Sequence, residues 1–509
     1  MKSRFSMYFF IITLVFTCLS VGLLMYFSKH PGRKTPAREA RAIWLHRFEY
    51  TGYTRTHDQD SIKQYIRQTI KNAADANFNL ILFQVRGNGD AYYTPGFEPW
   101  GELLTGTPGK DPGWDPLQYA IDQAHARGLE LHAWINTFPA WRGRTLPPET
   151  TPPAAILEHP EWIVCDSAGN PMPLSDHYIT FSPGIPAVQD YLIKVVTDIE
   201  QRYDVDGIHF DYIRYPEEAP RRGYSHDFIS VKRFQSEEGN PYHLEWEDWQ
   251  REQLNHFVYR MYDAITRIKP WVKMSASVIG NYNQSGWNAY YAVYQDPRRW
   301  TEMEKIDFII PMSYLNPGYF DQVIADWKNY NTIDRPVFPG IGSYRFTPRR
   351  HLKWDMTLQE MGAVRAHQIN GMSFFDASSL RNHWNTIRTH YFRHPANLPA
   401  MPWKKNAVPS APENIQVLGY PDSTVITWNA GAETPEDPVR VFTVYATPGT
   451  SIDSTNGMQV QAILPGNQFR WVTRCPACID PGWQFGVTAV DRYGNESRLT
   501  LSAKRQKNL

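Results

Sequence analysis

Acidic, basic and imidazole side chains meet at the end of one apolar segment, residues 203–216. Side chains alternate between the two faces of a strand, so His209 and Asp211 share one face. Pro216 lacks the N–H that a sheet requires and ends the segment. Asp211 and Arg214 are therefore expected where a strand opens into a loop. A carboxylate in this position is how parallel α/β barrels present a catalytic acid or base.

Two further carboxylates, Asp90 and Asp376, follow other segments with strand character. The chain also contains 18 Trp and 29 Tyr, and flat aromatic faces beside carboxylates suit sugar rings. Hydrolysis of a glycosidic bond uses two carboxyl groups, one that protonates the leaving oxygen and one that acts as nucleophile or activates water. We therefore expect Asp211 to be catalytic, with Asp90 or Asp376 as the acid. A neighbouring arginine, Arg86 or Arg214, would hold Asp211 ionised, as a nucleophile or base requires.

The other polar and aromatic side chains at these segment ends are candidate substrate contacts. They are Arg86, Asn88, Trp134, Asn136, His209, Arg214 and Tyr314. A metal site is the alternative, because His132, His209 and Asp211 carry ligand atoms. These three come from different segments without a close-spaced motif, and histidines inside a barrel are commonly hydrogen-bonded core groups. We therefore expect neither a metal nor another cofactor.

Strand-like apolar segments alternate with amphipathic segments over residues 41–400, a pattern typical of parallel strands joined by helical crossovers. The eight predicted strands are residues 42–45, 80–85, 129–135, 206–211, 272–278, 308–314, 336–341 and 371–376. Predicted helices between them include residues 62–76, 116–127, 186–203 and 247–268. Eight such units predict an α/β fold, a (β/α)8 TIM barrel, with long insertions after the second, third and fourth strands.

The composition shifts to proline, lysine and asparagine across a predicted linker at residues 401–412. Residues 413–509 then contain short strand-like runs in place of helices. One tryptophan on an early strand, a tyrosine on the next and turn residues between them are typical of a β-sandwich. This part resembles a fibronectin type III domain, particularly at residues 488–497 (TAVDRYGNES). Such a module spaces or binds, so we expect no catalysis there.

An apolar run at residues 7–27 has basic residues on both sides and is long enough to span a bilayer. It lacks the short apolar core and the small-residue cleavage site of a cleaved signal peptide. We expect residues 1–28 to be an uncleaved signal anchor, residues 29–40 a linker, and the rest of the chain to be exported to the cell envelope. Lipidation at Cys18 is the less favoured alternative, because the apolar run continues beyond it.

The charges and cysteines exclude several classes of protein. Lys plus Arg and Asp plus Glu are 52 each without a basic run, so nothing indicates a nucleic-acid partner. Four cysteines in 509 residues do not form a disulfide framework. Cys475 and Cys478 make a single CxxC, which we interpret as a local disulfide because neither a second pair nor a nearby histidine completes a zinc site.

Seven segments, in order along the chain, resemble glycosyl hydrolase-like family 10. They are residues 41–44 (RAIW), 84–92 (QVRGNGDAY), 99–106 (PWGELLTG), 115–117 (DPL), 124–128 (AHARG), 132–136 (HAWIN) and 206–216 (DGIHFDYIRYP). The resemblance covers residues 38–400 and implies an exported barrel hydrolase; some members of the family cleave peptidoglycan strands that have lost their stem peptides. It also implies that Asp211 is the catalytic carboxylate of the fourth strand, with Arg86, Asp90, His209 and Arg214 as its neighbours.

The sixth strand departs from the family pattern, which is Pro-Gln-x-Tyr-Trp. Residues 311–315 of this chain read PMSYL, so contacts with the preferred glycan are expected to differ there. We predict a membrane-anchored glycoside hydrolase that cleaves O-glycosidic bonds of a cell-wall-type glycan, such as peptidoglycan strands without stem peptides. The alternative is a catalytically silent barrel that binds glycan as a scaffold of the cell envelope.

Overall fold

The computed structural model describes residues 35–52, 57–314, 317–330, 333, 335–346, 353–432, 438–449, 451–474, 482–503 and 506–507. The predicted signal anchor with Cys18, and the CxxC pair Cys475 and Cys478, lie outside the described residues. Within the described ranges, every helix is too short or too polar to cross a bilayer.

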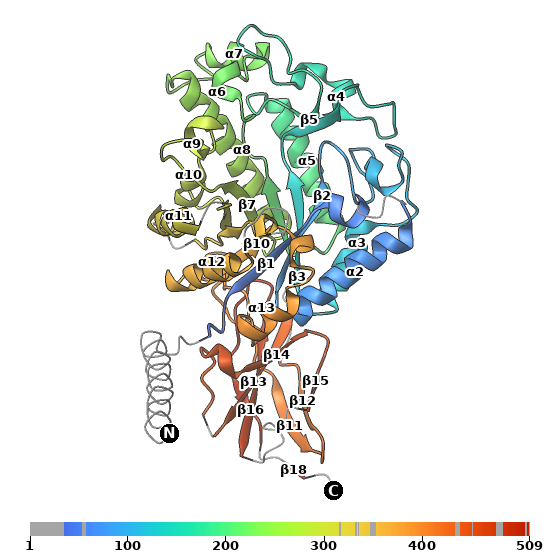
Figure 1. Ribbon diagram of the computed structural model, residues 1–509, viewed down its shortest axis with the longest axis vertical. Helices are drawn as coiled ribbons and strands as arrows, with labels where there is room; N and C mark the ends of the chain where they lie inside the picture. Colours follow the sequence, from blue (N-terminus) through green and yellow to red (C-terminus); the bar gives the residue numbers. More distant parts are fainter. Residues whose placement is uncertain are drawn as a thin grey trace, which may run out of the picture.

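Eight parallel strands close into a barrel in chain order, and the last strand pairs with the first (Figure 1). They are β1 (Ala40–Leu45), β2 (Leu80–Arg86), β3 (Glu130–Asn136), β6 (Gly207–Asp211), β7 (Lys273–Ile279), β8 (Phe308–Met312), β9 (Gly340–Ile341) and β10 (Gly371–Phe374). Each of the eight predicted strands corresponds to one of these, so the TIM barrel is confirmed.

Helices lie between successive strands and surround the barrel (Figure 1). They are α2 (Gln59–Asp75), α3 (Pro116–His125), α5 (Pro186–Arg202), α8 (Trp246–Ile268), α10 (Pro297–Glu302), α11 (Pro317–Tyr330), α12 (Asp355–Ala366) and α13 (Trp384–His390). The four predicted helices are confirmed, with ends within three residues of the prediction. Helix α3 shows why the ends were predictable: Asp115 accepts a hydrogen bond from the Gln118 N–H, Pro116 occupies the first turn, and Gly128 lies in the left-handed region just beyond the helix.

Short elements fill the loops at the carboxyl ends of the strands, including the three predicted long insertions. After β1, β2, β9 and β10 they are η1 (Phe48–Gly52), η2 (Glu102–Leu104), η4 (Ser343–Phe346) and η6 (Ala377–Leu380). The insertion after β3 contains β4 (Pro139–Gly143), α4 (Ala155–Glu158), η3 (Pro160–Trp162) and β5 (Ser175–Thr180). Strands β6 and β7 are followed by α6 (Ala219–Arg222), α7 (Phe228–Phe234) and α9 (Ala289–Ala292).

Side chains of the barrel strands alternate between two cores. On β1, Leu45 packs with the surrounding helices, whereas Trp44 belongs to the core inside the barrel. On β6, Phe210 packs outward, so His209 and Asp211 face the interior as the alternation predicted. The strand that carries Asp211 therefore delivers it to the open end of the barrel.

The C-terminal part consists of two four-stranded sheets, β15-β12-β11-β18 and β14-β13-β16-β17. The elements are β11 (Glu413–Gly419), β12 (Thr424–Asn429), β13 (Val441–Pro448), η7 (Gly457–Gln459), β14 (Val460–Pro465), β15 (Arg470–Thr473), β16 (Trp483–Val490), β17 (Thr500–Leu501) and β18 (Gln506–Lys507). Ile415 and Trp428 of one sheet share a buried cluster with Phe442 and Phe485 of the other. This arrangement fits the predicted β-sandwich, and the likeness to fibronectin type III stays a prediction.

The sandwich is held against the amino ends of the barrel strands by buried charges. Asp206, just before β6, accepts a hydrogen bond from Arg440 Nε at 2.9 Å and lies 2.8 Å from His125 Nε2. Lys273, at the start of β7, donates to the Arg492 carbonyl at 3.0 Å. Burial alone would raise the pKa of Asp206, but Arg440 and His125 lower it well below its usual value. The module therefore covers one end of the barrel and leaves the carboxyl ends open (Figure 1).

Candidate active site

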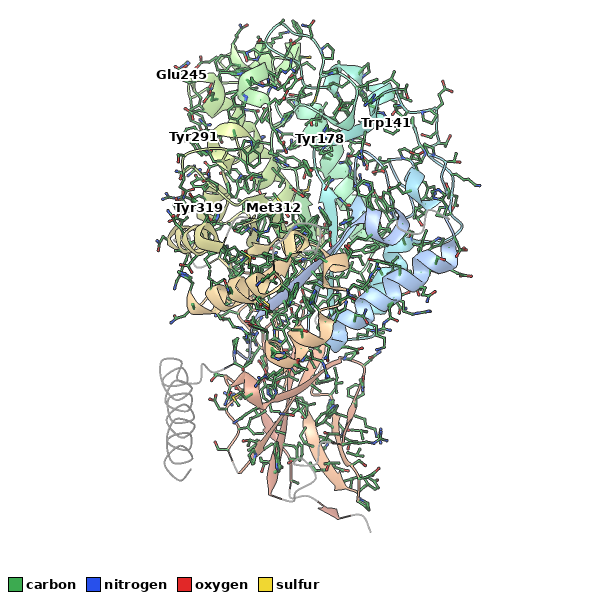
Figure 2. All side chains as sticks on the ribbon, in the orientation of Figure 1. Trp141, Tyr178, Glu245, Tyr291, Met312 and Tyr319 are labelled. Carbon is green, nitrogen blue, oxygen red and sulfur yellow. The ribbon has the colours of Figure 1, made fainter. Side chains whose placement is uncertain are left out.

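A cavity of about 410 Å³ opens at the carboxyl ends of the barrel strands. Its walls are Trp44, His46, Arg47, Phe48, Gln84, Asn88, Trp134, Asn136, Arg142, His177, Tyr178, Asp211, Tyr212, Arg214, Ser277, Met312, Tyr314 and Phe375. Tyr178 and Met312 are labelled in Figure 2. Asp211 is the one carboxylate among these described side chains, and aromatic faces make up much of the remaining wall. The cavity therefore combines a single acid with surfaces that suit sugar rings.

Asp211 is the last residue of β6 and its carboxyl group is withdrawn from water. The residue is 7% exposed, and its Oδ1 accepts a hydrogen bond from the Tyr212 N–H at 2.7 Å. Tyr212 has a φ of 58°, a backbone conformation that side chains other than glycine rarely adopt. Burial raises the pKa of Asp211 to about 6, although the Arg214 charge and the Tyr212 N–H both lower it.

The raised pKa changes the role expected for Asp211. Arg214 lowers the pKa of Asp211, as predicted for a neighbouring arginine, but desolvation outweighs this charge. A carboxylic acid with a pKa of about 6 stays protonated in mildly acidic solution. Asp211 is therefore suited to donate a proton to a leaving oxygen, the role that the sequence analysis predicts for Asp90 or Asp376.

Arg86 is not a substrate contact, so that prediction is wrong. The side chain is fully buried and pairs with Glu98, whose oxygens lie 2.7 to 2.9 Å from its Nη2 and Nε. Its Nη1 donates to the carbonyls of Asn136, Thr137 and Pro139. Arg86 therefore ties the end of β2 to the loop after β3 and positions that loop. Sequence reasoning missed Glu98, because an isolated glutamate in a loop has no pattern that predicts its partner.

His209 lies beneath the cavity floor, so the predicted substrate contact is wrong here too. The residue is fully buried, its Nδ1 lies 2.9 Å from Ser275 Oγ, and its Nε2 lies 2.9 Å from Ser277 Oγ. The Trp44 indole N–H donates to the same Nε2 at 3.1 Å. Burial, followed by the nearby His132, lowers the pKa of His209 well below its usual value, so the ring is neutral. Its effect is to fix Trp44 and Ser277, which do line the cavity.

Asp90 does not line the cavity that contains Asp211, but it lines a second cavity that shares wall residues with the first. Its Oδ1 accepts the N–H groups of Gly87 and Asn88 at 3.0 and 2.7 Å, and its Oδ2 accepts the Tyr92 hydroxyl at 3.2 Å. These bonds order the loop after β2. Asp90 therefore has a role in loop geometry, and its predicted role as the acid stays a prediction.

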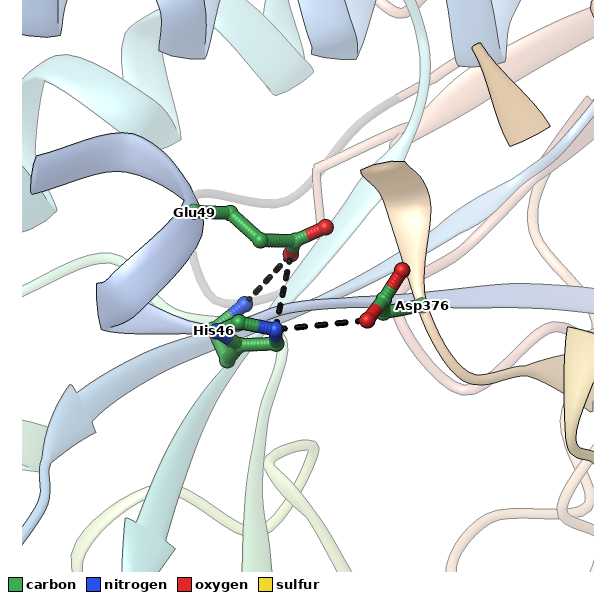
Figure 3. Close-up of side chains that lie close together, drawn as sticks. All are labelled: His46, Glu49 and Asp376. Atoms are coloured by element: carbon green, nitrogen blue, oxygen red, sulfur yellow. Dashed lines mark hydrogen bonds and ion pairs between the residues drawn. The ribbon is translucent and has the colours of Figure 1, made fainter. Parts of the chain in front are cut away.

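Asp376 acts on the cavity through His46 (Figure 3). His46 follows β1 and lines the cavity, and its Nε2 lies 3.4 Å from Asp376 Oδ2 and 3.8 Å from Glu49 Oε2. Asp376 also accepts hydrogen bonds from the Ser378 hydroxyl and the Ser379 N–H, at 2.7 and 2.9 Å. Asp376, which we predict as a catalytic acid, does not itself line the cavity and meets His46 instead.

The two carboxyl groups around His46 have opposite pKa shifts. Burial opposes the ionisation of Asp376, but hydrogen bonds from His46 and Ser378 lower its pKa below the usual value. Burial and the nearby charge of Asp376 together raise the pKa of Glu49 to about 7, against the opposing effect of His46. In the described part of the chain, His46 Nδ1 is enclosed without a hydrogen-bond partner.

His46, Glu49 and Asp376 also have the composition of a cation site. Their ligand atoms lie within 4.8 Å of one another, and they are the one such group found among the described residues. The metal ligands considered from the sequence, which included His132 and His209, do not form such a group. Each carboxylate oxygen of Glu49 and Asp376 already meets a protein donor, so the cluster is satisfied as a hydrogen-bond network.

The structure places the other five predicted substrate contacts in the cavity wall. They are Asn88, Trp134, Asn136, Arg214 and Tyr314. Burial raises the pKa of Tyr314 well above its usual value, and the charges of Asp211 and Asp376 add to this shift, so this ring lies close to both acids. Sequence reasoning missed the residues after β1 and those of the β4–β5 insertion. The polar run at residues 46–49 was the available signal for the first group.

A second cavity of about 320 Å³ adjoins the first. The two share four wall residues, Arg47, Phe48, Asn88 and Arg142. Trp100 and Trp141 line the second cavity, and Trp141 is labelled in Figure 2. The two cavities therefore adjoin along a shared wall.

The family model described as Glycosyl hydrolase-like 10 matches residues 39–346, more than half of the chain. The chain belongs to this family. It is 26% identical over 495 residues to the glycosyl hydrolase YngK of Bacillus subtilis (strain 168), which covers 91% of this chain and 92% of that protein. It is 32% identical over 271 residues to the glycosyl hydrolase DigH of Escherichia coli (strain K12), covering 49% of this chain and 58% of DigH.

Among solved structures, the chain is similar to the glycoside hydrolase domain of PgaB (BpsB) from Bordetella bronchiseptica. The TM-score is 0.47 at 12% identity, and the match covers 69% of this chain and 98% of that domain. Membership of the glycosyl hydrolase-like 10 family, together with the two named relatives, identifies the chain as a glycoside hydrolase and not as a silent scaffold.

The pKa of Asp211 sets the expected pH dependence of this glycosyl hydrolase-like 10 protein. A general acid works only while it is protonated, so kcat/KM should fall about tenfold for each pH unit above about 6. A pH series of initial rates, with the unfolding temperature followed in the same buffers, measures this. A rate that rises as the pH increases through 6 would instead show that Asp211 acts in its ionised form.

Proposed function

We propose that this enzyme cleaves O-glycosidic bonds within a cell-wall-type glycan, with peptidoglycan strands that lack stem peptides as its substrate and Asp211 as the general acid. The observation that carries the proposal is the Asp211 carboxyl, buried at the mouth of the barrel with a pKa of about 6. The two adjoining cavities support a polymeric substrate, because aromatic side chains line both of them.

In the proposed reaction Asp211 donates its proton to the leaving oxygen while positive charge develops on the sugar ring. Withdrawal from water keeps the acid protonated, and the Tyr212 N–H and Arg214 stabilise the carboxylate that the transfer leaves behind. Trp44 and Tyr314 provide flat walls against which a sugar can stack.

The second group of the reaction is His46, held by Asp376. Asp376 stays ionised, and the Nε2 atom of His46 lies within 3.4 Å of it. Nδ1 is enclosed, so proton exchange of His46 runs through Nε2, where Asp376 stabilises the imidazolium form. Asp376 is then a positioning residue, and Glu49 fixes the backbone of the same loop through the His46 N–H.

Replacement of the acid tests the first part of the proposal. Asp211→Asn should lower kcat by about 10²- to 10⁴-fold, because the amide cannot donate the proton. The variant should still bind the glycan strand. Reducing ends released from peptidoglycan strands with and without stem peptides measure cleavage, and co-sedimentation with the strands measures binding. Asp190→Asn on the exposed face of α5 is the matched control and should cleave normally. Equal cleavage by Asp211→Asn and wild type would contradict the role of Asp211.

A double-mutant comparison tests the second part. His46→Gln should lower kcat by about 10²-fold with little change in KM, and Asp376→Asn should lower it less. The double variant should be no slower than His46→Gln alone, because Asp376 acts through His46. The exposed pair His367 and Asp321, whose Nε2 and Oδ1 lie 3.0 Å apart, offers the control His367→Gln, expected to leave kcat unchanged. Additive losses in kcat would show that Asp376 acts independently of His46.

We also propose that residues 7–27 anchor the enzyme in a membrane with the barrel exported. The support is the apolar run of 21 residues with basic residues on both sides. The full chain should then fractionate with membranes and be degraded by protease added outside spheroplasts, whereas a chain that begins at residue 35 should stay in the cytosol. Protection of the full chain from external protease would contradict export.

A further inference from the structure

Arg214 is buried at the cavity wall, and among the described residues no carboxylate is hydrogen-bonded to it. Arg41, Arg86 and Arg345 each have a carboxylate oxygen within 2.8 Å. Arg214 is 7% exposed, and within the described ranges its Nε and Nη1 atoms are enclosed without a hydrogen-bond partner. The nearest carboxylate oxygen that forms an ion pair with it belongs to the exposed Glu217, 3.5 Å from Nη1. A buried charge without a bonded partner costs free energy, so the position indicates a function.

The surroundings hold the Arg214 side chain in place at the wall of the 410 Å³ cavity. Its guanidinium carbon lies 4.5 Å from the centre of the Tyr212 ring, and that ring meets Tyr178 edge-on at 4.9 Å. Burial opposes the positive charge, but Tyr178, Tyr212 and Asp211 raise the pKa of Arg214, so the group stays charged. The aromatic contacts restrict the guanidinium without satisfying its N–H donors.

The charges of the cavity wall favour an anion. Arg47 and Arg142 line the same cavity, and Asp211 is the one carboxylate among the described wall residues. Below its pKa of about 6 Asp211 is neutral, so three arginines then face the cavity without a fixed negative charge in the wall. Such a wall attracts a negatively charged sugar and disfavours a neutral one only weakly.

We propose that Arg214 binds the carboxylate of an acidic sugar next to the bond that is cleaved. The inference rests on the proposed function, and it gives a physical reason for a preference for strands without stem peptides. The stem peptide is joined to the muramic-acid sugar through an amide on this carboxylate, so removal of the peptide creates the negative charge. A guanidinium donates charge-assisted hydrogen bonds to a carboxylate and loses most of that interaction with an amide.

A pair of substrates that differ only in this charge tests the proposal. One is peptidoglycan strands with free carboxylates, and the other is the same strands after conversion of the carboxylates to methylamides. Wild type should cleave the acidic strands with a kcat/KM about 10- to 100-fold higher than the amidated strands. In Arg214→Met this ratio should fall close to one, and Arg214→Lys should give an intermediate ratio. A wild-type ratio near one, or a ratio that Arg214→Met leaves unchanged, overturns the proposal.

Two controls separate the role of Arg214 from a fault in folding or in overall charge. Arg221→Met removes an exposed arginine seven residues away on α6, paired with Glu218, and should leave the ratio unchanged. Arg214→Met should unfold at no lower temperature than wild type, because it removes a buried charge that lacks a bonded partner. A variant with a lower unfolding temperature but an unchanged ratio would show that Arg214 is structural, which overturns the proposal.

Binding of single sugars tests carboxylate recognition by Arg214 independently of glycan cleavage. By calorimetry, wild type should bind N-acetylmuramic acid at least tenfold more tightly than its methylamide, and Arg214→Met should bind both equally. If wild type cleaves both kinds of strand equally well, the proposed function stands and the inference fails. If it cleaves neither kind, the proposed peptidoglycan substrate fails, and the calorimetric preference alone decides whether Arg214 recognises a carboxylate.

Discussion

Withdrawal of one carboxyl group from water is the effect on which the site depends. Asp211 ends β6 at the open end of a closed parallel barrel, where the surrounding strands and insertions leave it 7% exposed. Desolvation there exceeds the opposing effects of the Arg214 charge and the Tyr212 N–H, so the pKa of the acid rises to about 6. Closure of the barrel therefore determines the pKa of Asp211, because it removes this carboxyl group from water.

Closure of the barrel also brings the ends of the domain together at the site. Strand β1 pairs with β10, so His46 after β1 meets Asp376 after β10, although 330 residues separate them. Glu49 completes this cluster, and its raised pKa contrasts with the lowered pKa of Asp376. Two buried carboxyl groups around one imidazole thus have opposite shifts, which is the condition under which neighbouring groups take different proton-transfer roles.

Buried arginines have two separate uses in this chain. Arg86 with Glu98, and Arg440 with Asp206, join segments that are distant in sequence, and each guanidinium has a carboxylate within 2.9 Å. These pairs fix the loop after β3 and the contact between barrel and sandwich. Arg214 is equally buried but has no carboxylate bonded to it. Arg214 instead forms an ion pair with the exposed Glu217 at 3.5 Å, and its position at the cavity wall is the basis of its proposed role in binding.

Local patterns in the sequence determined the eight strands, the helix ends capped by residues such as Asp115, and the face of β6 that carries Asp211, because alternation and capping act over a few residues. The position of Trp134, Asn136 and Tyr314 at the same end of the barrel followed from the shared direction of parallel strands. Tertiary structure alone decided that Arg86 pairs with Glu98, that His209 is enclosed by serines, and that Asp376 reaches the cavity through His46. It also decided the protonation of Asp211. Each of these outcomes depends on distances and on loss of water between residues far apart in the chain, and no local pattern encodes those quantities.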